Sequence, residues 1–106
     1  GLAGYCRARH GQDAPIAGCH GTELATLYIR PAMQRHGIGR ALLSNLKAIA
    51  QARNSPALWL CVNCKNHRAQ AFYAAHGFDV LGKTDFVLGE NRYPNYLLRC
   101  DLSPVG

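Results

Sequence analysis

Residues 27–40 read LYIRPAMQRHGIGR, and this stretch contains the turn from which the rest of the chain can be interpreted. A run of strand-forming residues ends at Pro31, which cannot donate a hydrogen bond to a sheet. The turn that follows carries Gly37 and Gly39 directly before an amphipathic segment. A helix that begins there exposes unpaired backbone N–H groups, and the glycines let a ligand approach them closely. The stretch therefore predicts a phosphate-binding turn at a helix N-terminus.

Charged residues support this interpretation of the turn, although its spacing fits neither of two common phosphate motifs. Arg35, His36 and Arg40 surround the glycines and add positive charge. The spacing is not that of a G-x-x-x-x-G-K-[ST] loop, nor that of a G-x-G-x-x-G dinucleotide fingerprint. Because Gly-x-Gly also occurs in plain tight turns, the turn alone leaves both interpretations open.

Outward from the turn, the chain alternates strands and helices. Apolar residues at steps of four, four and three predict an amphipathic helix over Ile38–Arg53. The nearly unbroken apolar run Ala57–Val62 predicts a strand covered on both faces. Asn66 is suited to cap a second helix over His67–His76, which Gly77 would end. Further strands are expected at Leu2–Arg9, Glu23–Arg30, Phe78–Leu88 and Tyr96–Leu102, with loops over residues 10–21 and 89–95.

Length and composition limit the classes of function. A chain of 106 residues forms one domain, here 1–106, and its net charge of +6 favours an anionic ligand. The basic residues are scattered instead of forming a continuous stripe, so a nucleic-acid partner is not expected. No stretch is long and apolar enough for a membrane span. The odd count of five cysteines and the lack of a targeting segment predict a cytoplasmic protein without a disulfide framework.

Two motifs together resemble those of one protein family. The element Gln34-x-x-Gly37-x-Gly39 resembles the Q/R-x-x-G-x-G/A element of the GNAT (Gcn5-related N-acetyltransferase) superfamily. Downstream, Asn66-x-x-Ala69-x-x-x-Tyr73-x-x-x-Gly77-Phe78 is similar to that family's second coenzyme-side helix and its exit. Both stand in the family's order, and the resemblance spans roughly residues 20–102. It implies an α/β (α+β) domain with a mixed, mostly antiparallel sheet, a central parallel splay and helices on both faces.

The resemblance also implies an activity and a set of binding residues. The expected activity is direct transfer of an acetyl group from acetyl-CoA to a primary amine of a small molecule or protein, in a ternary complex and without a metal. The family binds the CoA pyrophosphate on a turn that corresponds here to Gln34, Arg35, His36, Gly37, Ile38, Gly39 and Arg40. The pantetheine arm would lie against Leu27, Tyr28 and Ile29, with Asn66, Ala69 and Tyr73 beside it.

Two residues are candidates for the proton transfers of this reaction. An amine of pKa near ~10 is mostly protonated at neutral pH, so a base or a water chain must remove its proton. Glu23 is the candidate base, since some family members carry a glutamate on this strand. Tyr73 is the candidate acid for the leaving thiolate, and a strand N–H near Tyr28 would stabilise the oxyanion. Without the resemblance, Glu23 would be interpreted as solvated and Tyr73 as a core residue.

Other reactive residues have simpler interpretations. The spacing Cys61-x-x-Cys64-x-x-His67 suggests zinc, but a structural site needs four ligands, so small buried residues are the better interpretation. We expect the remaining candidates to be surface or loop residues, namely His10, His20, His76, Glu90 and Tyr93.

The chain departs from the family pattern at its start. Family domains usually open with a strand and helices before the position that matches Leu2. Three hypotheses follow: the chain is part of a longer acetyltransferase, a second copy covers the exposed edge strand in a homodimer, or the domain binds CoA without acylating anything. The last is the non-catalytic alternative to an enzyme.

Overall fold

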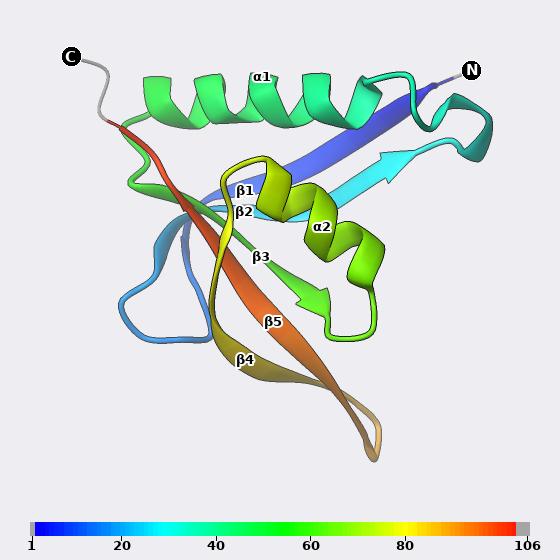
Figure 1. The fold of residues 1–106 in the computed structure, drawn as a ribbon. Coiled ribbons are helices and arrows are strands. Elements are labelled where there is room, and N and C mark those ends of the chain that lie inside the picture. Colours follow the sequence, from blue (N-terminus) through cyan, green and yellow to red (C-terminus); the bar gives the residue numbers. More distant parts are fainter. Residues whose placement is uncertain (1, 104–106) are drawn as a thin grey trace.

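The computed structural model describes residues 2–103, in which two α-helices accompany one five-stranded sheet (Figure 1). The strand order is β1-β2-β3-β5-β4, and every neighbouring pair is antiparallel except β2 and β3. The mixed, mostly antiparallel sheet expected from the sequence is therefore confirmed. In chain order the elements are β1 (Gly4–Asp13), β2 (His20–Ile29), the 3-10 helix η1 (Pro31–Met33), α1 (Ile38–Ala52), β3 (Ala57–Asn63), α2 (His67–Ala75), β4 (Asp79–Leu88) and β5 (Asn91–Asp101).

The parallel pair is short, and this opens the sheet at its centre. β2 and β3 are paired only at Thr22 with Leu58 and at Glu23 with Trp59. Beyond these residues the two strands diverge, while β3 stays paired with β5 along its whole length. The expected central splay is thus present, and its open side faces the turn that precedes α1 (Figure 1).

Both helices pack on the same face of the sheet, where helices on both faces were expected. Leu43, Leu46 and Ala50 of α1 join one buried cluster with Leu58, Leu60 and Val62 of β3, and Phe72 and Tyr73 of α2 pack against that cluster. Because side chains alternate along a strand, Trp59 points to the opposite face. There, in the described residues, it is covered by the loop that contains Ile16 and Cys19.

The loop expected at residues 10–21 is shorter than predicted. β1 runs on to Asp13 and β2 begins at His20, so His10 and His20 lie in strands. The glycine and polar content of this segment indicated a loop, but it is accommodated by irregular pairing between Arg9 and Gln12. Gly11 lies at this irregularity with φ of 66°, a conformation that glycine adopts at little cost.

The loop expected at residues 89–95 was also wrong, because β5 begins at Asn91 and leaves a two-residue turn. Pro94 lies within β5, although it cannot donate a hydrogen bond to a sheet. Its carbonyl accepts a hydrogen bond from the Cys64 N–H, just past Asn63 and Asn95, the last paired residues of β3 and β5. Its missing N–H therefore falls where the pairing of β5 with β3 has already ended, while β5 stays paired with β4. The helix ends are each one residue shorter than predicted, with Arg53 and His76 as C-caps.

Three features are absent from the described residues. No helix within residues 2–103 is long and apolar enough to cross a membrane. No group of three or more potential metal ligands occurs in the same part of the chain, and its five cysteines form no disulfide.

Candidate functional site

A cavity of about 530 Å³ lies at the open end of the splay, between the start of α1 and α2. We call it the helix-side cavity. Its lining combines the end of β2, the glycine turn and one side of α2. The lining residues are Leu27, Ile29, Met33, Gln34, Arg35, Gly37, Ile38, Gly39, Arg40, Asn66, Arg68, Ala69, Phe72 and Tyr73.

The N-terminus of α1 is the polar end of this cavity. Gly37 is the N-cap residue with φ of 76°, and it carries no side chain that could cap the helix. The first turn of α1 also contains no acidic residue. The backbone N–H groups at the start of the helix are therefore left without a side-chain partner in residues 2–103. With Arg35 and Arg40 beside them, these groups form a site suited to an anion.

Gln34 connects this turn to both walls of the cavity. Its amide nitrogen donates to the Ile29 carbonyl at 3.5 Å, and its amide oxygen accepts from the Arg68 guanidinium at 3.3 Å. Arg68 lies on the first turn of α2 and is exposed. The side chains of Gln34 and Arg68 thus bridge the glycine turn and α2.

Tyr73 forms the apolar end of the cavity, and Asn66 caps the helix that carries it. The Asn66 side chain accepts a hydrogen bond from the Ala69 N–H at 3.1 Å, as its role as N-cap predicts. The Tyr73 ring makes edge contacts with Phe72 and Phe78, with centroids 5.3 Å and 5.4 Å apart. Burial raises the pKa of the Tyr73 hydroxyl above its ordinary value of 10.0, so it holds its proton at neutral pH.

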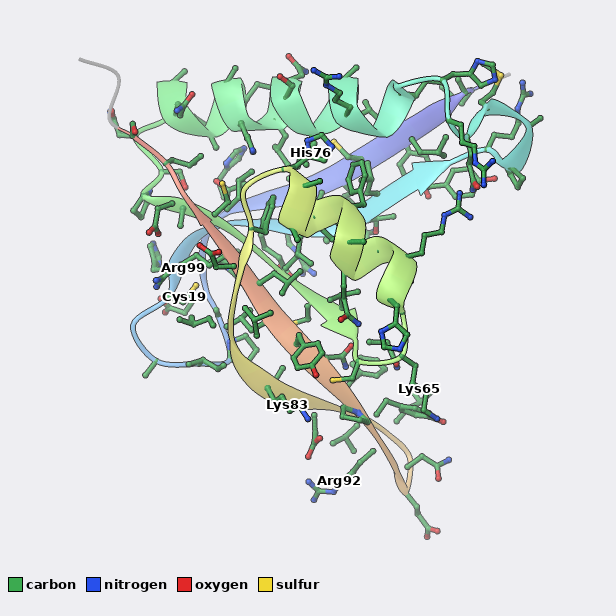
Figure 2. All side chains as sticks on the ribbon, viewed as in Figure 1. Cys19, Lys65, His76, Lys83, Arg92 and Arg99 are labelled. Atoms are coloured by element: carbon green, nitrogen blue, oxygen red, sulfur yellow. The ribbon has the colours of Figure 1, made fainter. Side chains whose placement is uncertain are left out.

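A lysine fixes α2 against α1. Lys47 of α1 donates to the carbonyl of His76 at 2.5 Å, and its ammonium lies 5.7 Å from the centre of the Phe78 ring. A cation at the C-terminal end of a helix is favoured by the helix dipole. His76 lies at the end of α2 below α1 (Figure 2). This contact holds the helix that carries Tyr73 in a fixed position relative to the glycine turn.

The backbone of β2 directs alternate residues toward the splay. The N–H of Arg30 donates to the Ala3 carbonyl beyond the start of β1, and Tyr28 pairs with Tyr5 in the same register. Backbone groups of alternate strand residues point to opposite edges of the strand. The N–H and C=O of Tyr28 therefore point toward β1, and those of Leu27 and Ile29 point toward the opening. The Tyr28 side chain does not line the cavity; it lies 5.6 Å from the Tyr5 ring.

A second cavity, of about 510 Å³, lies on the face of the sheet opposite the helices. We call it the hairpin-side cavity, because β4 and β5 form much of its wall. It is lined by Pro15, Glu23, Leu24, Ala25, Trp59, Cys61, Asn63, Thr84, Asp85, Phe86, Tyr93 and Asn95. The Glu23 carboxylate pairs with the Arg9 guanidinium at 3.1 Å. The Cys61 side chain is exposed, where a small buried residue was expected. Desolvation by the neighbouring strands and the nearby Glu23 raise the pKa of its thiol, which stays neutral at neutral pH.

The predicted site residues fall into three groups. The helix-side cavity brings together Leu27, Ile29, Gln34, Arg35, Gly37, Ile38, Gly39, Arg40, Asn66, Ala69 and Tyr73. Tyr28 and His36 do not line it, and Glu23 lines the other cavity. The sequence interpretation missed Met33, Arg68 and Phe72. The helical spacing of Phe72, three residues after Ala69, and of Arg68, four residues before Phe72, would have indicated these two.

The sequence matches a protein-family model and several known relatives. The model of the acetyltransferase (GNAT) family matches residues 1–78. An uncharacterised N-acetyltransferase of Mycobacterium tuberculosis is 34% identical over 97 residues, covering 92% of this chain and 58% of that protein. The Escherichia coli enzyme named as the alanine N-acetyltransferase of ribosomal protein bS18 is 37% identical over 73 residues, covering 66% of this chain and 46% of its own. The chain thus spans about half the length of these relatives.

Solved structures share the fold. The crystal structure of Chaetomium thermophilum Naa20 in complex with a bisubstrate analogue has a TM-score of 0.81 at 24% identity, over 94% of this chain and 60% of that one. The crystal structure of the E. coli ribosomal-protein-S18-alanine N-acetyltransferase has a TM-score of 0.68 at 29% identity, over 80% and 56% of the two chains.

Proposed function

This chain belongs to the acetyltransferase (GNAT) family, and from that membership we propose that it binds acetyl-CoA in the helix-side cavity and transfers the acetyl group to a primary amine. The observation that carries the proposal is the uncapped start of α1 beside Arg35 and Arg40, at the open end of the splay. A diphosphate is the kind of anion that such a helix N-terminus binds.

The residues present fit coenzyme A along the length of the cavity. The polar end offers N–H groups of the glycine turn and two arginines for phosphate oxygens. The middle offers the β2 edge at Leu27 and Ile29, whose backbone groups would pair with the amide groups of a pantetheine arm as an added strand would. The far end is apolar, with Phe72 and Tyr73. We therefore assign the oxyanion donor to the β2 edge at Leu27 or Ile29, since the backbone of Tyr28 is directed to β1.

The hairpin-side cavity is our proposed acceptor site. β2 contributes to both cavities: Glu23 and Ala25 line the hairpin side, and Leu27 and Ile29 line the helix side. A donor and an acceptor bound in the two cavities would thus approach each other along one strand. Holding both in position supplies roughly 7 kcal/mol or more of the barrier reduction, without a nucleophilic residue.

Two side chains would handle the protons. Acetyl-CoA supplies the acetyl group as a thioester. Glu23 would accept a proton from the acceptor ammonium, directly or through water, so that the free amine can form the new amide bond. Tyr73, which keeps its proton at neutral pH, would donate it to the sulfur as the thioester bond breaks, and the second proton lost by the attacking nitrogen would return to Tyr73 through water.

The direct test is a thermal-shift titration with acetyl-CoA, followed by mass spectrometry of an amine panel incubated with protein and acetyl-CoA. A ligand that binds only the native state adds about 2.7 kcal/mol of stability at a hundred times its Kd. We expect a shift and at least one acetylated amine. Binding without any acetylated amine would favour the non-catalytic alternative, a CoA-binding or regulatory module. Absence of a shift would contradict the proposal.

A further inference from the structure

The hairpin-side cavity has a charge pattern that is unusual for this basic chain. Two of its lining residues, Glu23 and Asp85, are carboxylates, and none of the described lining residues is a lysine or arginine. The chain as a whole carries a net charge of +6. Two carboxylates in a lining without a lysine or arginine favour a cation over an anion in this cavity.

Arginines outside the lining restrict how much positive charge the cavity can accept. Arg9 pairs with Glu23 at 3.1 Å, and Arg92 pairs with Asp85 at 3.5 Å. Both arginine side chains are exposed, by 61% and 73%, and Arg92 lies toward the far end of the β4–β5 hairpin, remote from both helices (Figure 2). One ammonium can share a carboxylate with its arginine. A second positive charge on the ligand would meet these two guanidinium groups, which repel it.

The rest of the wall is uncharged and largely apolar. Phe86 and Tyr93 face each other across the β4–β5 ladder and are 58% and 39% exposed. The Trp59 indole N–H already donates to the Gln12 carbonyl at 3.1 Å, so the ring offers no free donor. Cys61 remains a neutral thiol. Exposed aromatic side chains beside a cavity are typical of surfaces that bind apolar groups.

We infer that the acceptor carries one ammonium group on an uncharged, apolar body, with the ammonium at Glu23 and the body against Phe86 and Tyr93. This inference rests on the proposed function. Polyamines and amines on strongly basic peptides would then be poor substrates. A small aralkylamine and the free amino terminus of an apolar peptide share the required chemistry.

The test compares acceptors with the full chain and saturating acetyl-CoA, with products measured by mass spectrometry. The acceptors are 2-phenylethylamine, a peptide that begins Ala-Phe-Leu with a blocked C-terminus, its Ala-Lys-Lys counterpart, and spermidine. We expect kcat/KM for at least one apolar acceptor to exceed both basic acceptors by about tenfold or more, and the ratio between the two apolar acceptors distinguishes a small amine from a peptide.

A variant and its control test whether the preference for apolar acceptors depends on the hairpin-side cavity. Phe86→Ser should lower kcat/KM for the apolar acceptor about fivefold or more and leave spermidine within about twofold. Val80→Ser is the matched control, because Val80 lies on the same strand with 59% exposure and lines neither cavity. If spermidine were acetylated as well as or better than the apolar acceptors, or if the two variants had equal effects, this inference would be overturned and the proposed function would stand. Acetylation of no acceptor at all would overturn the proposed function and the inference together.

Discussion

The helix-side and hairpin-side cavities are of similar volume but are built in different ways. The helix-side cavity comes from two short stretches, residues 27–40 and 66–73, and its polar end is mostly backbone. The hairpin-side cavity draws side chains from four strands and the loop after β1. Backbone binding groups depend on local conformation, whereas a side-chain wall depends on which strands become neighbours. The proposed donor site can therefore be recognised in the sequence, and the proposed acceptor site only in the fold.

The largest effect on catalysis is expected from substitution of Tyr73. Tyr73→Phe removes the proposed proton donor but keeps the ring contacts with Phe72 and Phe78, so kcat should fall about a hundredfold. The acetyl-CoA Kd should change less than about twofold, because a single hydroxyl at the apolar end adds little to affinity for the coenzyme. Steady-state kinetics and calorimetric titration measure the two effects.

Tyr5→Phe is the control for this change, since Tyr5 lies on β1 and lines neither cavity. Its kcat should match that of the unmodified protein. A Tyr73→Phe variant that keeps more than half of its kcat would show that the thiolate takes its proton from elsewhere.

A carboxylate at Gly37 should compete with the donor's phosphates. Gly37→Asp introduces a negative charge at the start of α1, which repels a diphosphate, so the acetyl-CoA Kd should rise about tenfold or more. Gly89→Asp is a matched control. Both glycines have positive φ, 76° and 61°, and a Cβ at either would meet no atom within 4 Å. Equal Kd values for the two variants would contradict a phosphate site at the turn.

A smaller effect is expected at Arg68. Arg68→Gln removes the guanidinium that bonds to Gln34, and the acetyl-CoA Kd should rise about fivefold through loss of a charged hydrogen-bond donor to phosphate. Acetyl-pantetheine, which lacks the diphosphate, should bind equally well to both proteins. An equal loss of affinity for acetyl-CoA and acetyl-pantetheine would mean that Arg68 acts only by positioning α2.

The smallest effect tests the electrostatics of the hairpin-side cavity. The carboxylate of Glu23 helps to raise the pKa of the Cys61 thiol, after burial as the larger cause. Glu23→Gln removes this negative charge, which lowers that pKa and raises the thiolate fraction at pH 8. Alkylation of Cys61 by iodoacetamide, followed by peptide mapping, should therefore be about twofold to threefold faster in the variant. An unchanged rate would indicate that the carboxylate and the thiol do not interact.

The sequence predicted the features that depend on local conformation better than those that depend on which elements become neighbours. Gly37, Gly39, Asn66, Gly77 and the apolar spacing of α1 act locally, so the turn, both helices and β3 were predicted to within a residue. The continuations of β1 and β5 come from hairpin pairing with the neighbouring strands β2 and β4, and this pairing outweighs the loop-forming tendency of Gly11 and Pro94. Whether α2 shares a face with α1 depends on packing around Phe78 and Lys47, which no local pattern encodes.

The proposed activity depends on binding of the coenzyme A diphosphate by the main-chain N–H groups from Arg35 to Arg40. A crystal structure of the chain with acetyl-CoA measures this directly. We predict diphosphate oxygens about 3 Å from amide nitrogens of that turn, with the acetyl thioester near Tyr73. A diphosphate bound at any other surface, with the turn left empty at saturating ligand, would contradict the account.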